Sequence, residues 1–234
     1  MVLTLLTNTA IKPKRIVIAN AKGGCGKTTI ATNLAAYLAN RNKNTVLLDL
    51  DNQASSMLWI KNRARKTPII TGIIPHKNAE HTATRTWQMR LPPGTHFLII
   101  DTPGGLNGFA LSDMIYAADL VIVPVLASAI DMDAAEKFIS TLKKLTQNVM
   151  PKVNIAVIAN RTRRGSKSFN LLYQFLTSSG VPYIGTLRDT QNYAKAAQSG
   201  LGIHELQTAG VEKDITQWQS IISWLQPMEF AAPQ

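Results

Sequence analysis

"ANAKGGCGKTTIATNL", residues 19–34, joins an apolar run to a stretch with helical patterning. Residues 26–28, Gly-Lys-Thr, match the end of the phosphate-binding pattern G-x-x-x-x-G-K-[ST], although Ala21 stands where the pattern has its first glycine. Gly23 and Gly24 leave the backbone free to curl its N–H groups around phosphate oxygens, and a helix N-terminus adds partial positive charge. The stretch therefore predicts a strand, a phosphate-binding loop and a helix.

The loop carries two lysines. Lys27 is placed to reach the β- and γ-phosphates of a nucleotide, and the Thr28 hydroxyl is placed to bind Mg²⁺. Lys22 precedes the turn, so we expect it to project from the other side of the loop instead of duplicating Lys27. The expected nucleotide-binding residues of the loop are Gly23, Gly24, Cys25, Gly26, Lys27, Thr28 and Thr29.

Apolar runs alternate with helical patterns along most of the chain. The runs are continuous and rich in β-branched residues, as expected for strands with both faces covered. Expected strands are residues 15–20, 45–50, 68–74, 96–101, 119–125, 153–160 and 181–187. Expected helices are residues 27–40, 54–66, 106–117, 131–146, 167–179 and 190–199. This order predicts an α/β fold with a mainly parallel, twisted sheet and helices on both faces.

Three carboxylates fall at or just after the ends of expected strands: Asp49, Asp51 and Asp101. Ligands of open parallel sheets bind beside the carboxyl ends of the strands. We therefore expect these carboxylates near the phosphate-binding loop.

A last helix is expected near the C-terminal end, with Pro227 stopping it. Its apolar stripe is typical of a helix that docks on the core, because residues 225–234 lack the lysines that a membrane-binding helix needs. The stripe consists of Val211, Ile215, Trp218, Ile222 and Leu225.

Composition points to a folded chain outside the membrane. The 234 residues are 45% hydrophobic and 17% charged, which fits one sizeable domain over residues 1–234 with a loosely held tail at 1–13. No apolar run reaches the roughly 18 residues that span a bilayer. Cys25 is the single cysteine, which excludes an internal disulfide framework. We expect a cytoplasmic protein without a leader segment.

The net charge of +11 suggests a polyanionic partner, most simply nucleic acid, although a merely solvated basic face remains an alternative. One group of basic residues lies between positions 53 and 100 and comprises Lys61, Arg63, Arg65, Lys66, Lys77, Arg85 and Arg90. A denser group within eight residues comprises Arg161, Arg163, Arg164 and Lys167.

"KGGCGKTT", residues 22–29, resembles the deviant Walker A signature of the ParA/MinD family of P-loop ATPases, and the resemblance extends over about residues 14–226. It implies ATP and Mg²⁺ as cofactors and ATP hydrolysis as the activity. In that family the earlier lysine crosses a dimer interface to the phosphates of the partner's ATP. The resemblance thus implies that Lys22 acts across an ATP-dependent homodimer while Lys27 binds its own nucleotide.

Two further stretches resemble family motifs. "LLDLDNQASS", residues 47–56, is similar to a motif containing D-x-D-P-Q, with Asn52 in place of the proline. The resemblance implies that Asp51 orients the attacking water and that Asp49 supports the Mg²⁺ environment.

"FLIIDTPGG", residues 97–105, resembles the Walker B strand. The resemblance implies that Asp101 holds Mg²⁺ through water and that residues 102–108 form a switch loop sensing the γ-phosphate. Asn160 stands where the family contacts adenine, although a strand-end asparagine is also a common turn residue.

"LRDTQNYAKAAQSGLGIHEL", residues 187–206, resembles the C-terminal stretch of small ParA proteins. For Arg188, pairing with a nearby acid or with the nucleotide is an open alternative to DNA contact. DNA binding is expected to be non-specific, because no base-reading side chains accompany the basic residues. The candidate phosphate-backbone contacts are Arg161, Arg163, Arg164, Lys167, Arg188 and Lys195.

The resemblance favours a nucleoid-associated ParA-type ATPase that segregates a plasmid or chromosome, with a ParB-like partner stimulating hydrolysis. Positioning of carboxysomes or chemosensory clusters remains open, as does a membrane-surface ATPase of the MinD kind, which the acidic tail disfavours. A nitrogenase-like iron protein is excluded, because one cysteine cannot hold an iron–sulfur cluster.

Overall fold

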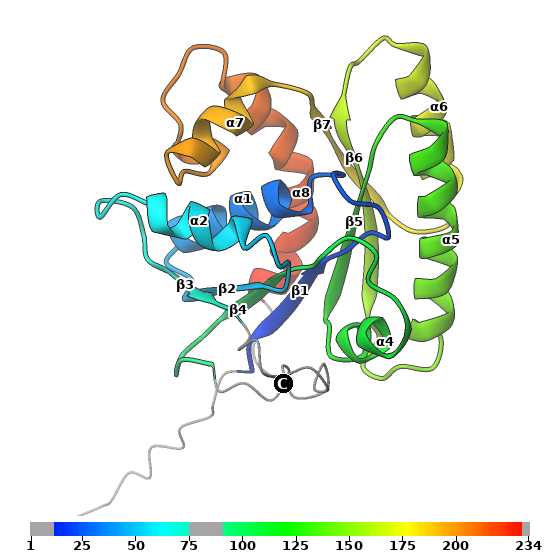
Figure 1. The fold of residues 1–234 in the computed structure, drawn as a ribbon, viewed down its shortest axis with the longest axis horizontal. Coiled ribbons are helices and arrows are strands. Elements are labelled where there is room, and N and C mark those ends of the chain that lie inside the picture. Colours follow the sequence, from blue (N-terminus) through cyan, green and yellow to red (C-terminus); the bar gives the residue numbers. More distant parts are fainter. Residues whose placement is uncertain (1–11, 75–90, 231–234) are drawn as a thin grey trace, which may run out of the picture.

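Continuous apolar runs form seven parallel strands within the part of the chain that the computed structural model describes, residues 12–74 and 91–230 (Figure 1). Along the sheet the strand order is β3-β2-β4-β1-β5-β6-β7. The predicted parallel α/β fold is therefore confirmed. The strands are β1 (Lys14–Ile18), β2 (Thr45–Asp49), β3 (Ile70–Ile73), β4 (Phe97–Asp101), β5 (Leu120–Val125), β6 (Asn154–Thr162) and β7 (Tyr183–Arg188).

Helices cover both faces of the sheet (Figure 1). Successive residues of a strand point to opposite faces, so Ile16 and Ile18 pack into one core and Val17 into the other. On the first face lie α1 (Lys27–Asn40), α2 (Ser55–Asn62), α7 (Gln191–Gln198), the short 3₁₀ helix η1 (Ile203–Glu205) and α8 (Glu212–Phe230). On the second lie α4 (Gly108–Tyr116), α5 (Ala129–Thr146) and α6 (Lys167–Ser178).

The prediction that Pro227 stops the last helix is wrong. Helix α8 continues through Pro227 to Phe230. A proline this close to the end removes one backbone hydrogen bond near the terminus and does not interrupt the middle of the helix. The preceding turns are held by apolar contacts, since Trp218, Ile221 and Leu225 are almost fully buried.

The sheet brings the predicted carboxylates to one edge. β2 and β4 are neighbours, and Asp49 is the register partner of Asp101 at their carboxyl ends. The predicted N-terminal tail lies mostly outside the described residues, which begin at residue 12. Within residues 12–74 and 91–230, no helix is long and apolar enough to cross a membrane.

Candidate active site

The loop between β1 and α1 depends on glycine at two positions. Gly24 and Gly26 have φ angles of 74° and 93°, which disfavour any residue with a side chain. A Cβ atom on Gly26 would lie 2.1 Å from Nδ2 of Asn160, which donates a hydrogen bond of 2.7 Å to the Cys25 carbonyl. The loop is thus closed against the end of β6, and Asn160 fastens it.

Lys27 holds its ammonium group inside the curve of the loop. The residue is 6% exposed, and Nζ donates a hydrogen bond of 3.0 Å to the Lys22 carbonyl. Burial raises the pKa of the neighbouring Cys25 thiol, and the Lys27 charge only partly opposes this. Cys25 is therefore a buried thiol that packs the loop.

Lys22 behaves differently from Lys27. Its backbone N–H donates to Oδ1 of Asn20 at 3.1 Å, which fixes the start of the loop. The side chain is half-buried, and its ammonium makes no hydrogen bond or ion pair with any residue in the described ranges. In the described residues, the ammonium groups of Lys22 and Lys27 therefore do not share a hydrogen-bond partner.

Asp49 and Asp101 are both 1% exposed. Asp49 accepts backbone hydrogen bonds from Asp51 at 3.0 Å and from Ser56 at 2.9 Å. The Ser56 hydroxyl donates to Oδ2 of Asp101 at 2.6 Å. Burial raises the pKa of Asp49, and hydrogen bonds from the Asp51 and Ser56 N–H groups oppose the increase.

Asp101 has the donor chemistry that suits Mg²⁺. Its Oδ1 is buried and accepts no hydrogen bond from the described residues. Burial raises the pKa of Asp101 to about 6, although the nearby hydroxyl groups of Ser56 and Thr28 lower it in part. An uncompensated carboxylate oxygen beside a threonine hydroxyl is a ligand set that a hard cation prefers. The residues present therefore fit Mg²⁺.

Asp51 lies in the turn between β2 and α2 and is half-buried. Its Oδ1 accepts a hydrogen bond of 3.0 Å from the Gln53 N–H, and its carbonyl accepts one from Ala54. Asp51 lines the same cavity as the phosphate-binding loop. A carboxylate in this position can accept a hydrogen bond from a water molecule in that cavity.

The cavity has a volume of about 430 Å³ and is bounded on one side by the loop and on the other by the ends of β6 and β7 and by α7. Asn160, Arg161 and Asp189 contribute to that second side, together with Tyr193. The Tyr193 hydroxyl accepts a hydrogen bond of 3.0 Å from the Trp218 indole, which anchors α7 against α8. One wall thus offers the glycine-rich loop with Lys27, and the other offers polar groups and an aromatic ring.

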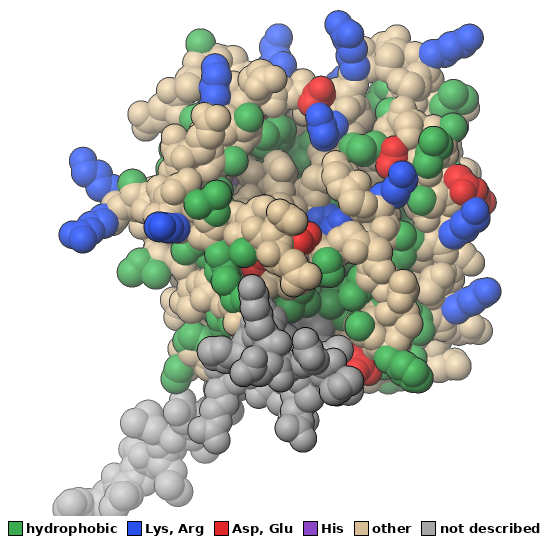
Figure 2. All heavy atoms as spheres, viewed as in Figure 1, with side chains coloured by type: hydrophobic (Ala, Val, Ile, Leu, Met, Phe, Trp, Pro, Cys, Tyr) green, Lys and Arg blue, Asp and Glu red, His purple; other side chains and the backbone are tan. Residues whose placement is uncertain are grey.

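The predicted DNA-binding residues lie at three places, and Arg188 lines both the groove and the cavity beside the loop. Arg163, Arg164 and Arg188 line a groove of about 770 Å³ between β7 and α8. Arg161 borders the cavity beside the loop and pairs with Asp189 at 3.4 Å. Figure 2 shows several Lys and Arg side chains projecting from the side of the molecule that carries α6 and α7. The exposed residues Lys167 and Lys195 stand on these two helices and line neither the groove nor the cavity.

Arg188 already has an acidic partner. Its guanidinium forms two hydrogen bonds with the fully buried Asp214, the second at 3.0 Å, and the hydrogen bond to Asp214 raises its pKa. The alternative left open by the sequence, pairing with a nearby acid, therefore describes Arg188 in this structure.

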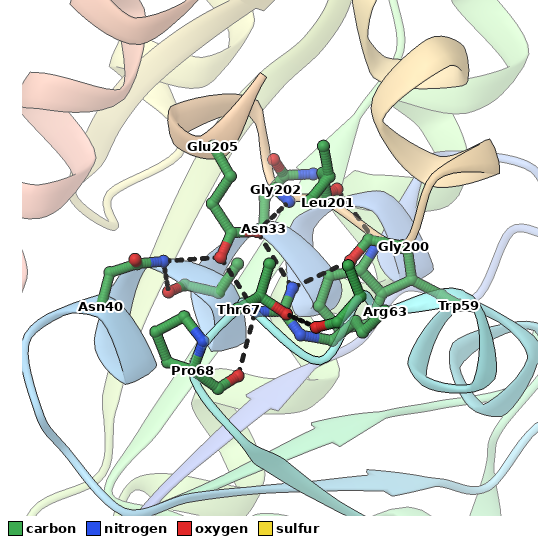
Figure 3. A network of polar contacts seen from close by, with 12 residues as sticks. Asn33, Asn40, Trp59, Arg63, Thr67, Pro68, Gly200, Leu201, Gly202 and Glu205 are labelled. Carbon is green, nitrogen blue, oxygen red and sulfur yellow. Dashed lines mark hydrogen bonds and ion pairs between the residues drawn. The ribbon is translucent and has the colours of Figure 1, made fainter. Parts of the chain in front are cut away.

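The basic group between positions 53 and 100 is not one surface. Arg63 is buried at the end of α2 and forms a two-bond ion pair with Glu205 at 2.8 and 2.9 Å (Figure 3). Its guanidinium also lies 4.8 Å from the centre of the Trp59 ring. Lys77, Arg85 and Arg90 lie outside the described residues. Arg63 is thus a structural residue and not a surface charge.

Three residues of the site were missed at the level of sequence. Ser56 bridges Asp49 and Asp101, Tyr193 lines the cavity, and Lys213 joins the arginine groove. Only Ser56 had a local signal, a hydroxyl in the first helical turn after a pair of aspartates. The other two depend on how α7 and α8 pack, which no short pattern specifies.

Known proteins resemble this chain in sequence and fold. The family described as CobQ/CobB/MinD/ParA nucleotide binding domain matches residues 16–203. The maintenance of carboxysome distribution protein A of Halothiobacillus neapolitanus is 27% identical over 196 residues, which cover 83% of this chain and 88% of that protein. The chromosome-partitioning ATPase Soj of Thermus thermophilus is 29% identical over 170 residues, with 62% and 67% covered.

A solved structure shares the fold. The structure of apo McdA from Cyanthece superimposes with a TM-score of 0.73 at 19% identity, covering 90% of this chain and all of that one. At this level of identity the likeness concerns the fold.

Proposed function

Because the chain belongs to the CobQ/CobB/MinD/ParA family of nucleotide-binding domains and is an ATPase of the ParA/MinD type, we propose that it is a DNA-associated positioning ATPase that dimerises on binding ATP and Mg²⁺. One observation carries the proposal. A phosphate-binding loop, two buried carboxylates and the half-buried Asp51 meet at one edge of the sheet, and a basic groove lies beside them. This arrangement supports a nucleotide site next to a surface that suits a polyanion.

The chemistry follows from the positions of the side chains. Mg²⁺, when bound, neutralises charge on the β- and γ-phosphates. Asp101 and Thr28 would hold it, with Asp49 in support, and Lys27 would leave the Lys22 carbonyl to bind the phosphates. Asp51 accepts a hydrogen bond from the attacking water and so orients it towards the γ-phosphate. These residues position the attacking water and neutralise charge on the phosphates, and phosphoryl transfer to water requires both.

The dimer depends on Lys22. Its ammonium lacks a partner in the described ranges, so it is available to a phosphate of the nucleotide bound by a second copy. Loss of the γ-phosphate then removes the group that both copies hold. Hydrolysis therefore loosens the dimer, and ATP acts as the signal for assembly.

Arg163, Arg164 and Lys213 are the residues of the groove that suit DNA phosphates, since the guanidinium of Arg188 is engaged by Asp214. The decisive experiment is an electrophoretic mobility shift with random-sequence DNA, using ATP, ADP or no nucleotide over a salt series. We expect a shift with ATP that weakens steeply with salt. Equal binding in all three nucleotide states would argue for a basic protein without an ATP-dependent DNA function.

A matched pair of double variants tests whether the groove residues Arg163 and Arg164 contact DNA. Changing Arg163 and Arg164 to Ala removes two charges beside the carboxyl end of β6, and we expect the slope of log affinity against log salt to fall by about 1–2. Changing Lys144 and Lys152 to Ala removes the same charge near the amino end of β6, where both residues are exposed. That control should bind DNA like the unmodified protein.

The cargo has two candidates. Plasmid or chromosome DNA, with a ParB-like partner that stimulates hydrolysis, fits the likeness to Soj. A protein assembly such as the carboxysome is the second candidate, favoured by the likeness to a protein that maintains carboxysome distribution. Purifying the ATP-bound dimer with its bound partners from the native cell and identifying them by mass spectrometry separates the two.

A further inference from the structure

Ser56 joins the two carboxylates at the cation end of the site. It lies in the first turn of α2 and is completely buried. Its backbone N–H donates to Oδ2 of Asp49 at 2.9 Å, and its hydroxyl donates to Oδ2 of Asp101 at 2.6 Å. One residue therefore fixes the ends of two neighbouring strands relative to each other.

The Ser56 hydroxyl group contacts only one of the two carboxylate oxygens of Asp101. It occupies Oδ2, whereas Oδ1 is buried and accepts no hydrogen bond from the described residues. A carboxylate held through one oxygen keeps its plane and presents the other oxygen in a fixed direction. Groups of this kind behind a metal ligand orient it, and their loss typically weakens metal affinity about 10–100-fold.

Ser56 also secures the turn that carries Asp51. Asp49 accepts hydrogen bonds from both the Asp51 and the Ser56 N–H groups, so residues 51–56 wrap around one buried carboxylate. Without the Ser56 hydroxyl group, Oδ2 of Asp101 would lose its 2.6 Å hydrogen bond, the Thr28 hydroxyl would be the nearby donor that remains, and the carboxylate could rotate. The backbone bonds to Asp49 would remain, because they do not use the side chain.

We propose that Ser56 is a positioning residue for Mg²⁺, holding Asp101 by Oδ2 so that Oδ1 faces the cation of the bound nucleotide. The inference rests on the Mg²⁺-dependent ATP binding proposed above. Ser56 touches neither the phosphates nor the attacking water in this role. Its effect is therefore on the requirement for Mg²⁺ and not on the nucleotide itself.

The test measures binding and not turnover. A fluorescent ATP analogue is titrated against the full chain in EDTA, and the binding is then measured over a series of free Mg²⁺ concentrations. For Ser56→Ala we expect the half-saturating Mg²⁺ concentration to increase about tenfold or more, with unchanged affinity in EDTA. Ser55→Ala is the matched control, because Ser55 is the adjacent residue, is exposed, and donates no side-chain hydrogen bond to any described residue.

Each outcome decides the proposal. An unchanged Mg²⁺ requirement in Ser56→Ala would overturn it, and so would an equal loss of affinity with and without Mg²⁺, since that indicates general damage to the site. If Ser56→Ala does not fold, Ser56→Cys keeps the volume with a much weaker donor and must show the same increase. A wild-type protein whose nucleotide binding ignores Mg²⁺ would instead refute the Mg²⁺ part of the proposed function, and this inference with it.

Discussion

Replacing Arg63 by Met tests the buried ion pair that ties the end of α2 to η1. The side chains of Arg63 and Glu205 are 6% and 9% exposed, and two hydrogen bonds join them (Figure 3). Arg63 also donates to the carbonyls of Gly200 at 2.9 Å and Pro68 at 3.1 Å. Methionine keeps much of the aliphatic volume but removes the charge and all four bonds.

The expected loss is large because Glu205 stays behind. Its carboxylate would keep the hydrogen bonds from Asn40 and from the Gly202 N–H, both of 2.7 Å, but would lose its counter-charge. Removing one partner of a buried ion pair costs about 3–5 kcal/mol of the free energy of unfolding. With a urea m-value of about 2–3 kcal/mol/M, the unfolding midpoint falls by about 1–2.5 M.

The assay is urea unfolding followed by circular dichroism, on Arg63→Met, Glu205→Leu and the double variant. Well-packed apolar residues can replace a buried ion pair at little cost in stability. The double variant should therefore lose less free energy of unfolding than the two single variants lose together. The exposed pair of Lys137 and Asp133 is the control, and its disruption should barely move the midpoint. A loss below about 1 kcal/mol for Arg63→Met, or strict additivity, would refute the reasoning.

The pH dependence of the same variants gives a second check. Burial alone raises the pKa of Glu205, but the hydrogen bonds from Arg63, the Gly202 N–H and Asn40 outweigh it and hold the pKa below its ordinary value of 4.5. A lowered pKa in the folded state means that the stabilisation is complete above the unfolded-state pKa and is lost as pH falls through the folded-state value. The gap between wild type and Arg63→Met should therefore narrow below pH 4.5.

The remaining predictions concern the nucleotide site. Lys22→Ala should abolish ATP-dependent dimers while leaving nucleotide binding by the monomer partly intact, and light scattering that shows unchanged dimers would contradict the role across the interface. Asp51→Asn should lower the hydrolysis rate at least about 100-fold while ATP still binds, measured by phosphate release; a rate within a few-fold of wild type excludes Asp51 as the group that orients water. Because burial raises the pKa of Asp101 to about 6, its protonation should compete with Mg²⁺ at acidic pH, and the half-saturating Mg²⁺ concentration should increase below that pH, approaching about tenfold per pH unit. Asp101→Asn removes this carboxyl group but leaves Asp49 and the nucleotide to titrate, so it should lack the part of the slope that belongs to Asp101.

Local patterns predicted the elements better than their ends. The glycine-rich turn between β1 and α1 was readable because Gly24 and Gly26 adopt positive φ angles that depend on short-range sterics. The prediction that Pro227 ends the last helix was wrong, because proline interrupts a helix most strongly in its interior. The observed end lies only a few residues further, at Phe230. Tertiary packing holds the turns before Pro227, since Trp218, Ile221 and Leu225 are almost fully buried.

By itself, the sequence determined a parallel α/β sheet, a glycine-rich loop after its first strand, and aspartates at strand ends, because periodicity and glycine act over a few residues. Only the tertiary structure decided that Asp49 and Asp101 stand side by side, that Ser56 bridges them, and that Arg63 meets Glu205 from 142 positions away. These contacts depend on the order in which the strands pair and on which helices share a face. That order is set by the packing of whole elements, and no short stretch of residues encodes it.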